Sequence, residues 1–241
     1  MTANISNDLH GLSGRNVVIT GGTGVLGSAV TRALVDAGAV CHIPCFQPST
    51  PERFELAEHE QVKLSFAVDL TSETSIASFY GSIQDHGGEL WASVHVAGGF
   101  AMGPLVDTSL ADFRRMVDLN GVTCFLSCRE AARAMTAGGR MVNVAAQPVV
   151  QPVSGMVAYS TSKAMVASMT QSLALELSPR GILVNAVLPS IIDTPGNRAS
   201  MPNADHDAWP KPSEIAETIR FLVSPHNALT SGALVPVYGR A

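Results

Sequence analysis

A tyrosine and a lysine four residues apart, Tyr159 and Lys163 in the segment YSTSK, have the clearest potential for proton transfer. Four residues span about one helical turn, so both side chains would lie on the same face of a helix. A phenol has a reference pKa of about 10, and a nearby ammonium favours the phenolate. The pair therefore predicts acid–base chemistry, with Tyr159 as the acid or base and Lys163 lowering its pKa.

A glycine-rich turn near the start of the chain is the second chemical pattern. Gly22, Gly24 and Gly27 form G-x-G-x-x-G in VVITGGTGVLGSAV, after Thr20 and Gly21. The turn stands between an expected strand and an expected helix, which is the context in which this pattern binds dinucleotides. Glycines allow a tight turn and a close approach of the backbone to a pyrophosphate, and the helix N-terminus supplies free N–H groups. The sequence therefore predicts a dinucleotide site at this turn.

The elements that would position these residues alternate between short β-branched runs and segments of helical period. Strands are expected near 16–20, 39–45, 62–67, 91–97, 140–145, 182–187 and 233–237, and helices near 25–37, 73–85, 110–136, 156–178 and 213–223. Such alternation is typical of a parallel sheet with helices on both faces. We predict an α/β fold, a single doubly wound domain over residues 1–241 with seven parallel strands and helices on both faces.

One long segment, 188–212, is rich in Pro, Asn and Asp and is expected to be irregular. A loop of that length inside a compact domain is commonly functional, and its place after a strand end predicts a substrate lid. We expect its part RASMPNADHDAW to be mobile without ligand and to protect Met201 and Trp209 when ligands bind.

Composition argues against several classes of partner. The formal net charge of −5, without a Lys/Arg-rich run, makes nucleic acid an unexpected partner. No run of about 18 apolar residues and no basic, then apolar, leader occurs, so we expect neither a membrane span nor export, and a cytoplasmic location. The chain is 46% hydrophobic and 15% charged, which predicts a folded, self-associating protein.

The four cysteines fall into two pairs with a spacing of four, Cys41/Cys45 and Cys124/Cys128. No histidine or further cysteine follows either pair at the spacing of a zinc site. We therefore expect buried, reduced thiols and no metal. His95, in SVHVAGG, is expected to be a packed histidine at a strand end.

Seven segments, in this order and at these spacings, carry a family resemblance: TGGTGVLG, VDL, VAGG, DLNG, GGRMVNV, YSTSK and LPSIIDT. Over essentially the whole chain, the sequence resembles the short-chain dehydrogenases/reductases. The resemblance implies a Rossmann-type fold, hydride transfer with a nicotinamide cofactor, a small-molecule substrate, and a homodimer or homotetramer built through two long helices. It implies catalytic roles for Tyr159, Lys163 and Asn120, the last by holding a water through its helix backbone. The implied cofactor contacts are Thr20, Gly21, Gly22, Gly24, Leu26, Gly27, Asp69, Leu70, Ala97, Gly98, Tyr159, Lys163, Pro189, Ile192 and Thr194.

The segment after the second expected strand bears on the choice of cofactor. Cys45, Phe46 and Gln47 offer neither the acid that binds the ribose hydroxyls of NAD nor an adjacent arginine for the 2′-phosphate of NADP. Arg53 and nearby hydroxyl groups could reach a phosphate. Either NAD(H) or NADP(H) fits, with a slight preference for NADP(H) because no carboxylate would repel the phosphate.

The residue thirteen positions before Tyr159, where this family carries a catalytic serine, is Ala146. Losing such a donor to a developing oxyanion costs about 10²- to 10³-fold in rate. A conjugated quinonoid or pterin-like substrate would account for the alanine. The segments around Tyr159 and in the lid resemble the quinonoid dihydropteridine reductases, a group within this family that also lacks the serine, although that group favours NADH through an acid that this chain lacks.

Two alternatives to a conjugated substrate stay open. Gln147 could present its amide in place of the serine, in a ketone or enone reductase. The chain could also be a nucleotide-binding interaction or sensor protein without turnover, because a fold alone does not establish catalysis.

Overall fold

Seven parallel strands form the centre of the computed structural model, which describes residues 9–85 and 88–240. They are β1 (Asn16–Thr20), β2 (Val40–Pro44), β3 (Val62–Ser65), β4 (Leu90–His95), β5 (Gly139–Val144), β6 (Ile182–Pro189) and β7 (Leu234–Val237). Their order is β3-β2-β1-β4-β5-β6-β7, and every neighbouring pair is parallel. The order reverses between β1 and β4, where doubly wound sheets bind ligands at the carboxyl ends of their strands.

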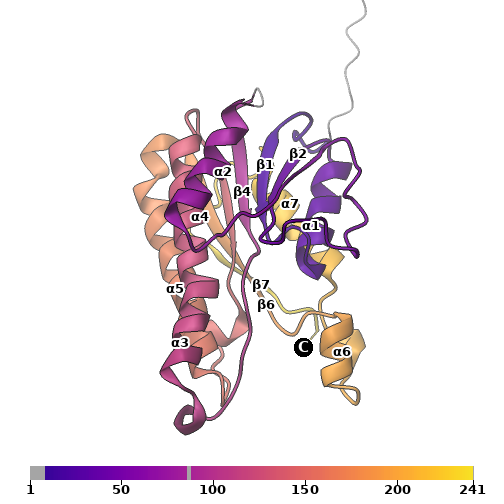
Figure 1. Ribbon diagram of the computed structural model, residues 1–241, viewed down its shortest axis with the longest axis vertical. Helices are drawn as coiled ribbons and strands as arrows, with labels where there is room; N and C mark the ends of the chain where they lie inside the picture. Colours follow the sequence, from indigo (N-terminus) through magenta and orange to yellow (C-terminus); the bar gives the residue numbers. More distant parts are fainter. Residues whose placement is uncertain (1–8, 86–87, 241) are drawn as a thin grey trace, which may run out of the picture.

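Helices cover both faces of this sheet (Figure 1). On one face, α1 (Val25–Asp36) and α7 (Pro212–Val223) share a core with β1 and β2, to which Leu34 and Ile219 contribute. On the other face lie α2 (Glu73–Asp85), α4 (Thr123–Ala134) and α5 (Val157–Glu176). The predicted α/β fold is confirmed. Residues 1–8, 86–87 and 241 of the predicted single domain lie outside the described residues.

The segment predicted as one helix over 110–136 has three parts. It comprises α3 (Leu110–Met116), a π-helical turn η2 (Val117–Val122), and α4. Ser109 begins α3 by accepting a hydrogen bond from the Asp112 N–H at 3.1 Å. A π turn inserts one additional residue, and such turns are frequent at functional sites. The prediction of one uninterrupted α-helix is therefore wrong in the middle of the segment.

The segment 188–212 is more regular than predicted. Its first two residues complete β6, and it contains α6 (Pro195–Ser200) and a 3₁₀ turn η5 (His206–Ala208). Thr194 caps α6 by accepting from the Asn197 N–H at 3.1 Å, and proline at the first helical position suits a helix start. Trp209 is only 6% exposed, with its ring 4.6 Å from that of His206. The chain itself already buries the Trp209 side chain. The mobility of this segment without ligand, and the protection of Met201 and Trp209 on binding, stay predictions.

The C-terminal segment after β7 is hydrogen-bonded to two places in this region. The Ser190 hydroxyl donates to the Tyr238 carbonyl at 2.8 Å, and the Arg240 N–H donates to the Ala208 carbonyl at 2.8 Å. The remaining short turns are η1 (Leu105–Asp107), η3 (Gln147–Val149) and η4 (Ser178–Arg180). In the described part of the chain, no helix combines the length and apolar character needed to cross a membrane.

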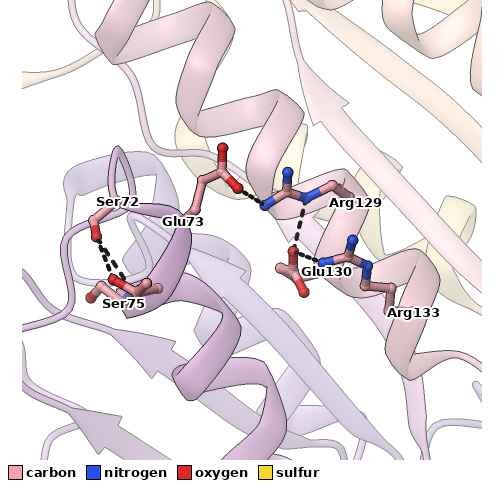
Figure 2. A network of polar contacts seen from close by, with 7 residues as sticks. Ser72, Glu73, Ser75, Arg129, Glu130 and Arg133 are labelled. Atoms are coloured by element: carbon pink, nitrogen blue, oxygen red, sulfur yellow. Dashed lines mark hydrogen bonds and ion pairs between the residues drawn. The ribbon is translucent and has the colours of Figure 1, made fainter.

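A charged network joins α2 to α4 (Figure 2). Glu73 at the start of α2 pairs with Arg129 at 3.1 Å. The buried carboxylate of Glu130 accepts from Arg129 at 2.9 Å and from Arg133 at 2.8 Å. Two guanidinium groups therefore compensate the one buried carboxylate, which would otherwise be costly to desolvate.

Candidate active site

Three glycines of the turn after β1 are required by the packing of the protein itself. Gly21 has a φ of +68°, and a Cβ there would lie 2.8 Å from the Ala97 nitrogen. A Cβ on Gly22 would meet the Ile43 side chain at 2.9 Å, and one on Gly27 would overlap the Gly21 carbonyl. These glycines let the turn fold tightly against β2, α1 and the loop after β4.

Gly24 differs from its neighbours because the folded chain itself does not require a glycine there. Its φ is −76°, and an added Cβ would meet only the Gly21 carbonyl oxygen, at an ordinary 3.4 Å. Gly24 is also the N-cap of α1, and no side chain caps that helix. An open backbone beside an uncapped helix N-terminus is the arrangement that receives a pyrophosphate. The turn therefore fits a dinucleotide.

Tyr159 and Lys163 lie one turn apart in α5, and Lys163 reaches the end of β5. The Lys163 ammonium is buried and donates to the Val144 carbonyl at 2.8 Å. The Tyr159 ring packs edge-on against Phe100, with 4.9 Å between ring centroids. Burial raises the pKa of Tyr159 to about 12 and lowers the pKa of Lys163 to about 8. The expected lowering of the phenol pKa by Lys163 is not found, because burial alone sets the direction of the shift.

Asn120 joins the π-helical turn to the loop after β4 and to α5. Its Nδ2 donates to the Gly99 carbonyl at 3.0 Å and to Ser162 Oγ at 3.1 Å, and its Oδ1 accepts from the Gly99 N–H at 3.1 Å. A Cβ on Gly98 would lie 2.5 Å from Asn120 Oδ1 and 3.2 Å from Lys163 Nζ. The structure thus brings Asn120, Lys163 and Gly98 together. Because the amide is occupied, a relay role for Asn120 would fall to its main chain.

Ala146 follows β5 and is buried. Its neighbour Gln147 donates from Nε2 to Gln151 Oε1 at 2.7 Å, within the same turn. The amide that could replace the serine hydroxyl is therefore engaged with another surface side chain.

Several of the predicted cofactor residues make hydrogen bonds or packing contacts near the carboxyl ends of the strands. Thr20 Oγ1 accepts from the Ala97 N–H at 3.4 Å, so the end of β1 is tied to the loop after β4. Pro189 ends β6, and the Ile192 carbonyl accepts from Asn197 Nδ2 at 2.8 Å beside the Thr194 cap. Leu26 is in the core on the α1 face and Leu70 packs on the opposite core.

Asp69, predicted to contact the adenine, is the acceptor of a local turn. Its Oδ1 accepts from the Thr71 N–H at 2.8 Å and from the Thr71 hydroxyl at 2.7 Å. These two bonds hold the pKa of Asp69 below its usual range. A contact between Asp69 and cofactor stays a prediction.

A pocket of about 600 Å³ is lined by residues that are close in sequence to Phe100 and Tyr159, whose rings pack together. Its walls come from residues 102–106, residues 153–155 and Val157. Met102, Val153 and Val157 are exposed there. An apolar molecule would cover these side chains.

Sequence reasoning missed one group of residues. His95 lies beside Cys124 and Cys128, and each residue offers a ligand atom within 4.8 Å of the others. The spacing of four residues between Cys124 and Cys128 was visible in the sequence. His95 could not be assigned to this pair, because it precedes Cys128 by 33 residues and comes from a strand. All four cysteines are free and buried, as expected.

Comparison with known proteins agrees with this geometry. Residues 15–205 match the family model described as short chain dehydrogenase. A 3-beta-hydroxysteroid dehydrogenase from Comamonas testosteroni is 28% identical over 92% of this chain and 93% of its own length. A dihydropteridine reductase from Dictyostelium discoideum is also 28% identical, over 92% of this chain and 93% of its own.

The fold has close structural counterparts. A short-chain type dehydrogenase/reductase from Mycobacterium ulcerans superposes with a TM-score of 0.86 at 25% identity, covering 95% of this chain and 90% of that one. The family model covers most of the chain, and the fold matches that of a solved member of the same family. The chain belongs to the short-chain dehydrogenase/reductase family of NAD(P)-dependent oxidoreductases.

Proposed function

We propose that this oxidoreductase reduces a conjugated, pterin-like or quinonoid ring, with Tyr159 as the proton donor. The observation that carries the proposal is Ala146, which has no hydroxyl, beside a Tyr159, Lys163 and Asn120 set that is otherwise complete. NAD(P)H, when bound, supplies the hydride. Tyr159 supplies the proton, and Lys163 and the Gly24 turn hold the dinucleotide.

The chemistry of the substrate explains why the serine is dispensable. An isolated carbonyl develops a localised oxyanion on reduction, which a nearby hydroxyl donor stabilises strongly. In a conjugated ring the developing charge is spread over several atoms, so a single dedicated donor matters less. The similarity to the dihydropteridine reductase from Dictyostelium and the apolar pocket at 102–106, 153–155 and 157 support this class of substrate.

The choice of cofactor follows from the end of β2. We propose NADP(H) over NAD(H), because Cys45, Phe46 and Gln47 carry no acid that would repel a 2′-phosphate, and Arg53 is exposed nearby. The same family is commonly oligomeric. Helices α4 and α5 carry exposed apolar side chains, namely Phe125, Met165 and Leu175. Their exposure supports a homodimer or homotetramer built through these two helices.

The test is stopped-flow oxidation of NADPH and NADH against a quinonoid dihydropterin, a quinone, a 3-ketoester and an enone. We expect turnover with the first two, faster with NADPH, and little with the ketoester. Ala146→Ser should leave the fold and the dihydropterin rate nearly unchanged. Preferred turnover of the ketoester or enone by the wild-type protein would favour a carbonyl or enone reductase. A change in cofactor fluorescence without oxidation of any substrate would favour a binding protein.

The pH profile provides a second test. Because burial lowers the pKa of Lys163 to about 8 and raises that of Tyr159 to about 12, Tyr159 keeps its proton across the neutral range while Lys163 loses its charge first. Without the ammonium, the phenolate left by proton donation is less stable. We expect kcat/KM for reduction to fall as the pH rises above about 8. A profile that stays flat to about pH 10 would contradict the role of Lys163.

A further inference from the structure

Three soft metal ligands lie together on the α4 side of the sheet. His95 ends β4, and Cys124 and Cys128 lie one turn apart on α4. All three are buried, and their ligand atoms lie within 4.8 Å of one another. Cys128 Sγ is 3.4 Å from His95 Nδ1. Bond lengths of about 2.3 Å to sulfur and about 2.0 Å to nitrogen give a tetrahedral zinc site a sulfur–nitrogen edge of about 3.5 Å. This pair already has that spacing.

A fourth donor is present in the same cluster. Asn143 on β5 is fully buried, and its Oδ1 lies 2.7 Å from His95 Nδ1 and 3.5 Å from Cys128 Sγ. Its Nδ2 donates to Thr170 Oγ1 at 2.8 Å, which fixes the amide with its oxygen toward the cluster. Two sulfurs, one imidazole nitrogen and one amide oxygen give four donor atoms, the number that a structural zinc ion takes, with the amide oxygen where such sites commonly carry a further Cys or His.

The ring of His95 also has the supporting contact that metal-bound histidines need. His95 Nε2 lies 2.8 Å from Ser93 Oγ, and Ser93 Oγ lies 2.8 Å from the Tyr80 hydroxyl. A ligating imidazole holds its second ring N–H in a hydrogen bond that fixes its tautomer and orientation. Without a cation, Nδ1–H donates to Asn143 Oδ1, because the Asn143 amide presents its oxygen to the ring. With Nδ1 as the ligand, this proton would move to Nε2, which would then donate to Ser93 Oγ.

The charges of the site also balance. Two thiolates neutralise a divalent cation, and neutral imidazole and amide add no charge, so the occupied site is neutral in a buried setting. Cation binding releases the protons that the two thiols still carry.

We propose that His95, Cys124 and Cys128, with the Asn143 amide oxygen, bind one thiophilic divalent cation of the zinc class. The cation would join β4 and β5 to α4. This site is separate from the dinucleotide turn and does not depend on the proposed substrate.

The experiment is a cobalt(II) titration of the full chain after dialysis against a chelator. We expect thiolate-to-cobalt charge-transfer and tetrahedral ligand-field absorption that saturates at one equivalent and is displaced by zinc. Cys124→Ala/Cys128→Ala should abolish the charge-transfer band. His95→Asn, which keeps a polar side chain, should weaken cobalt binding at least about tenfold.

Cys41→Ala/Cys45→Ala is the matched control, because these cysteines are also buried and four apart but lie outside the cluster. This variant should bind cobalt as the wild type does. Circular dichroism and cofactor fluorescence establish that each variant is folded. Absence of the band in wild-type protein, or its equal persistence in the folded His95→Asn variant, would overturn the proposal. If the double cysteine variant does not fold, the wild-type and His95→Asn titrations still decide the question.

Discussion

Replacing Tyr159 with phenylalanine is expected to lower turnover by about 10²- to 10⁴-fold, the usual contribution of a positioned proton donor. The change removes one oxygen and keeps the ring, so the edge-on contact with Phe100 at 4.9 Å is retained. Lys163 keeps its bond to the Val144 carbonyl. Dinucleotide affinity and stability should therefore be nearly unchanged, and the loss should be in kcat.

This result is measured by single-turnover oxidation of NADPH with the best substrate from the panel, beside a fluorescence titration of NADPH. Tyr238→Phe is the matched control, because it makes the same chemical change near the C-terminus, where Tyr238 contacts Ser190 through its main-chain carbonyl. That variant should keep wild-type turnover. A Tyr159→Phe rate within about twofold of wild type would show that another group supplies the proton.

Two alanine substitutions in the glycine turn are expected to affect different properties, one the stability of the fold and the other the binding of the dinucleotide. Gly27→Ala should destabilise the fold by about 3 kcal/mol, because its Cβ would overlap the Gly21 carbonyl and the backbone must move. Gly24→Ala should leave stability almost unchanged, because φ is −76° and the added methyl meets only an ordinary contact at 3.4 Å. That methyl would instead occupy the space where a pyrophosphate approaches α1.

Thermal unfolding and NADPH titration separate the two effects. Gly24→Ala should raise the Kd for NADPH at least about tenfold at a nearly unchanged Tm, since a displaced phosphate loses several charge-assisted hydrogen bonds. Gly27→Ala should lower the Tm, because its main effect is on the stability of the fold. Wild-type affinity in Gly24→Ala would place the pyrophosphate elsewhere, and wild-type stability in Gly27→Ala would contradict the close packing of α1.

The strands were predictable because a parallel sheet covered on both faces requires continuous apolar runs, and all seven lie within two residues of their predicted bounds. The π turn was not predictable, because one additional residue hardly disturbs the apolar pattern of 110–136. The structure reveals it in the backbone of Val117–Val122. The α6 helix had a readable signal, a threonine followed by proline at 194–195, within a segment whose composition otherwise indicated a loop.

For the site, motifs identified Tyr159, Lys163 and the glycines, because these residues act through short, local spacing. Their electrostatics could not be predicted in the same way. The pKa of Tyr159 rises with desolvation, which depends on how distant segments pack around α5. The same holds for His95, since only the sheet places a β4 residue against α4.

The π-helical turn at Val117–Val122 also sets the rotational phase between α3 and α4. Each residue of an α-helix advances the side chains by about 100°. Deleting one residue here would restore a regular helix but rotate α3 by about that angle relative to α4, and would turn Asn120 away from Gly99 and Ser162. Chain length is therefore fixed at this point, and an insertion or deletion that a surface loop tolerates would disconnect the loop after β4 from α5.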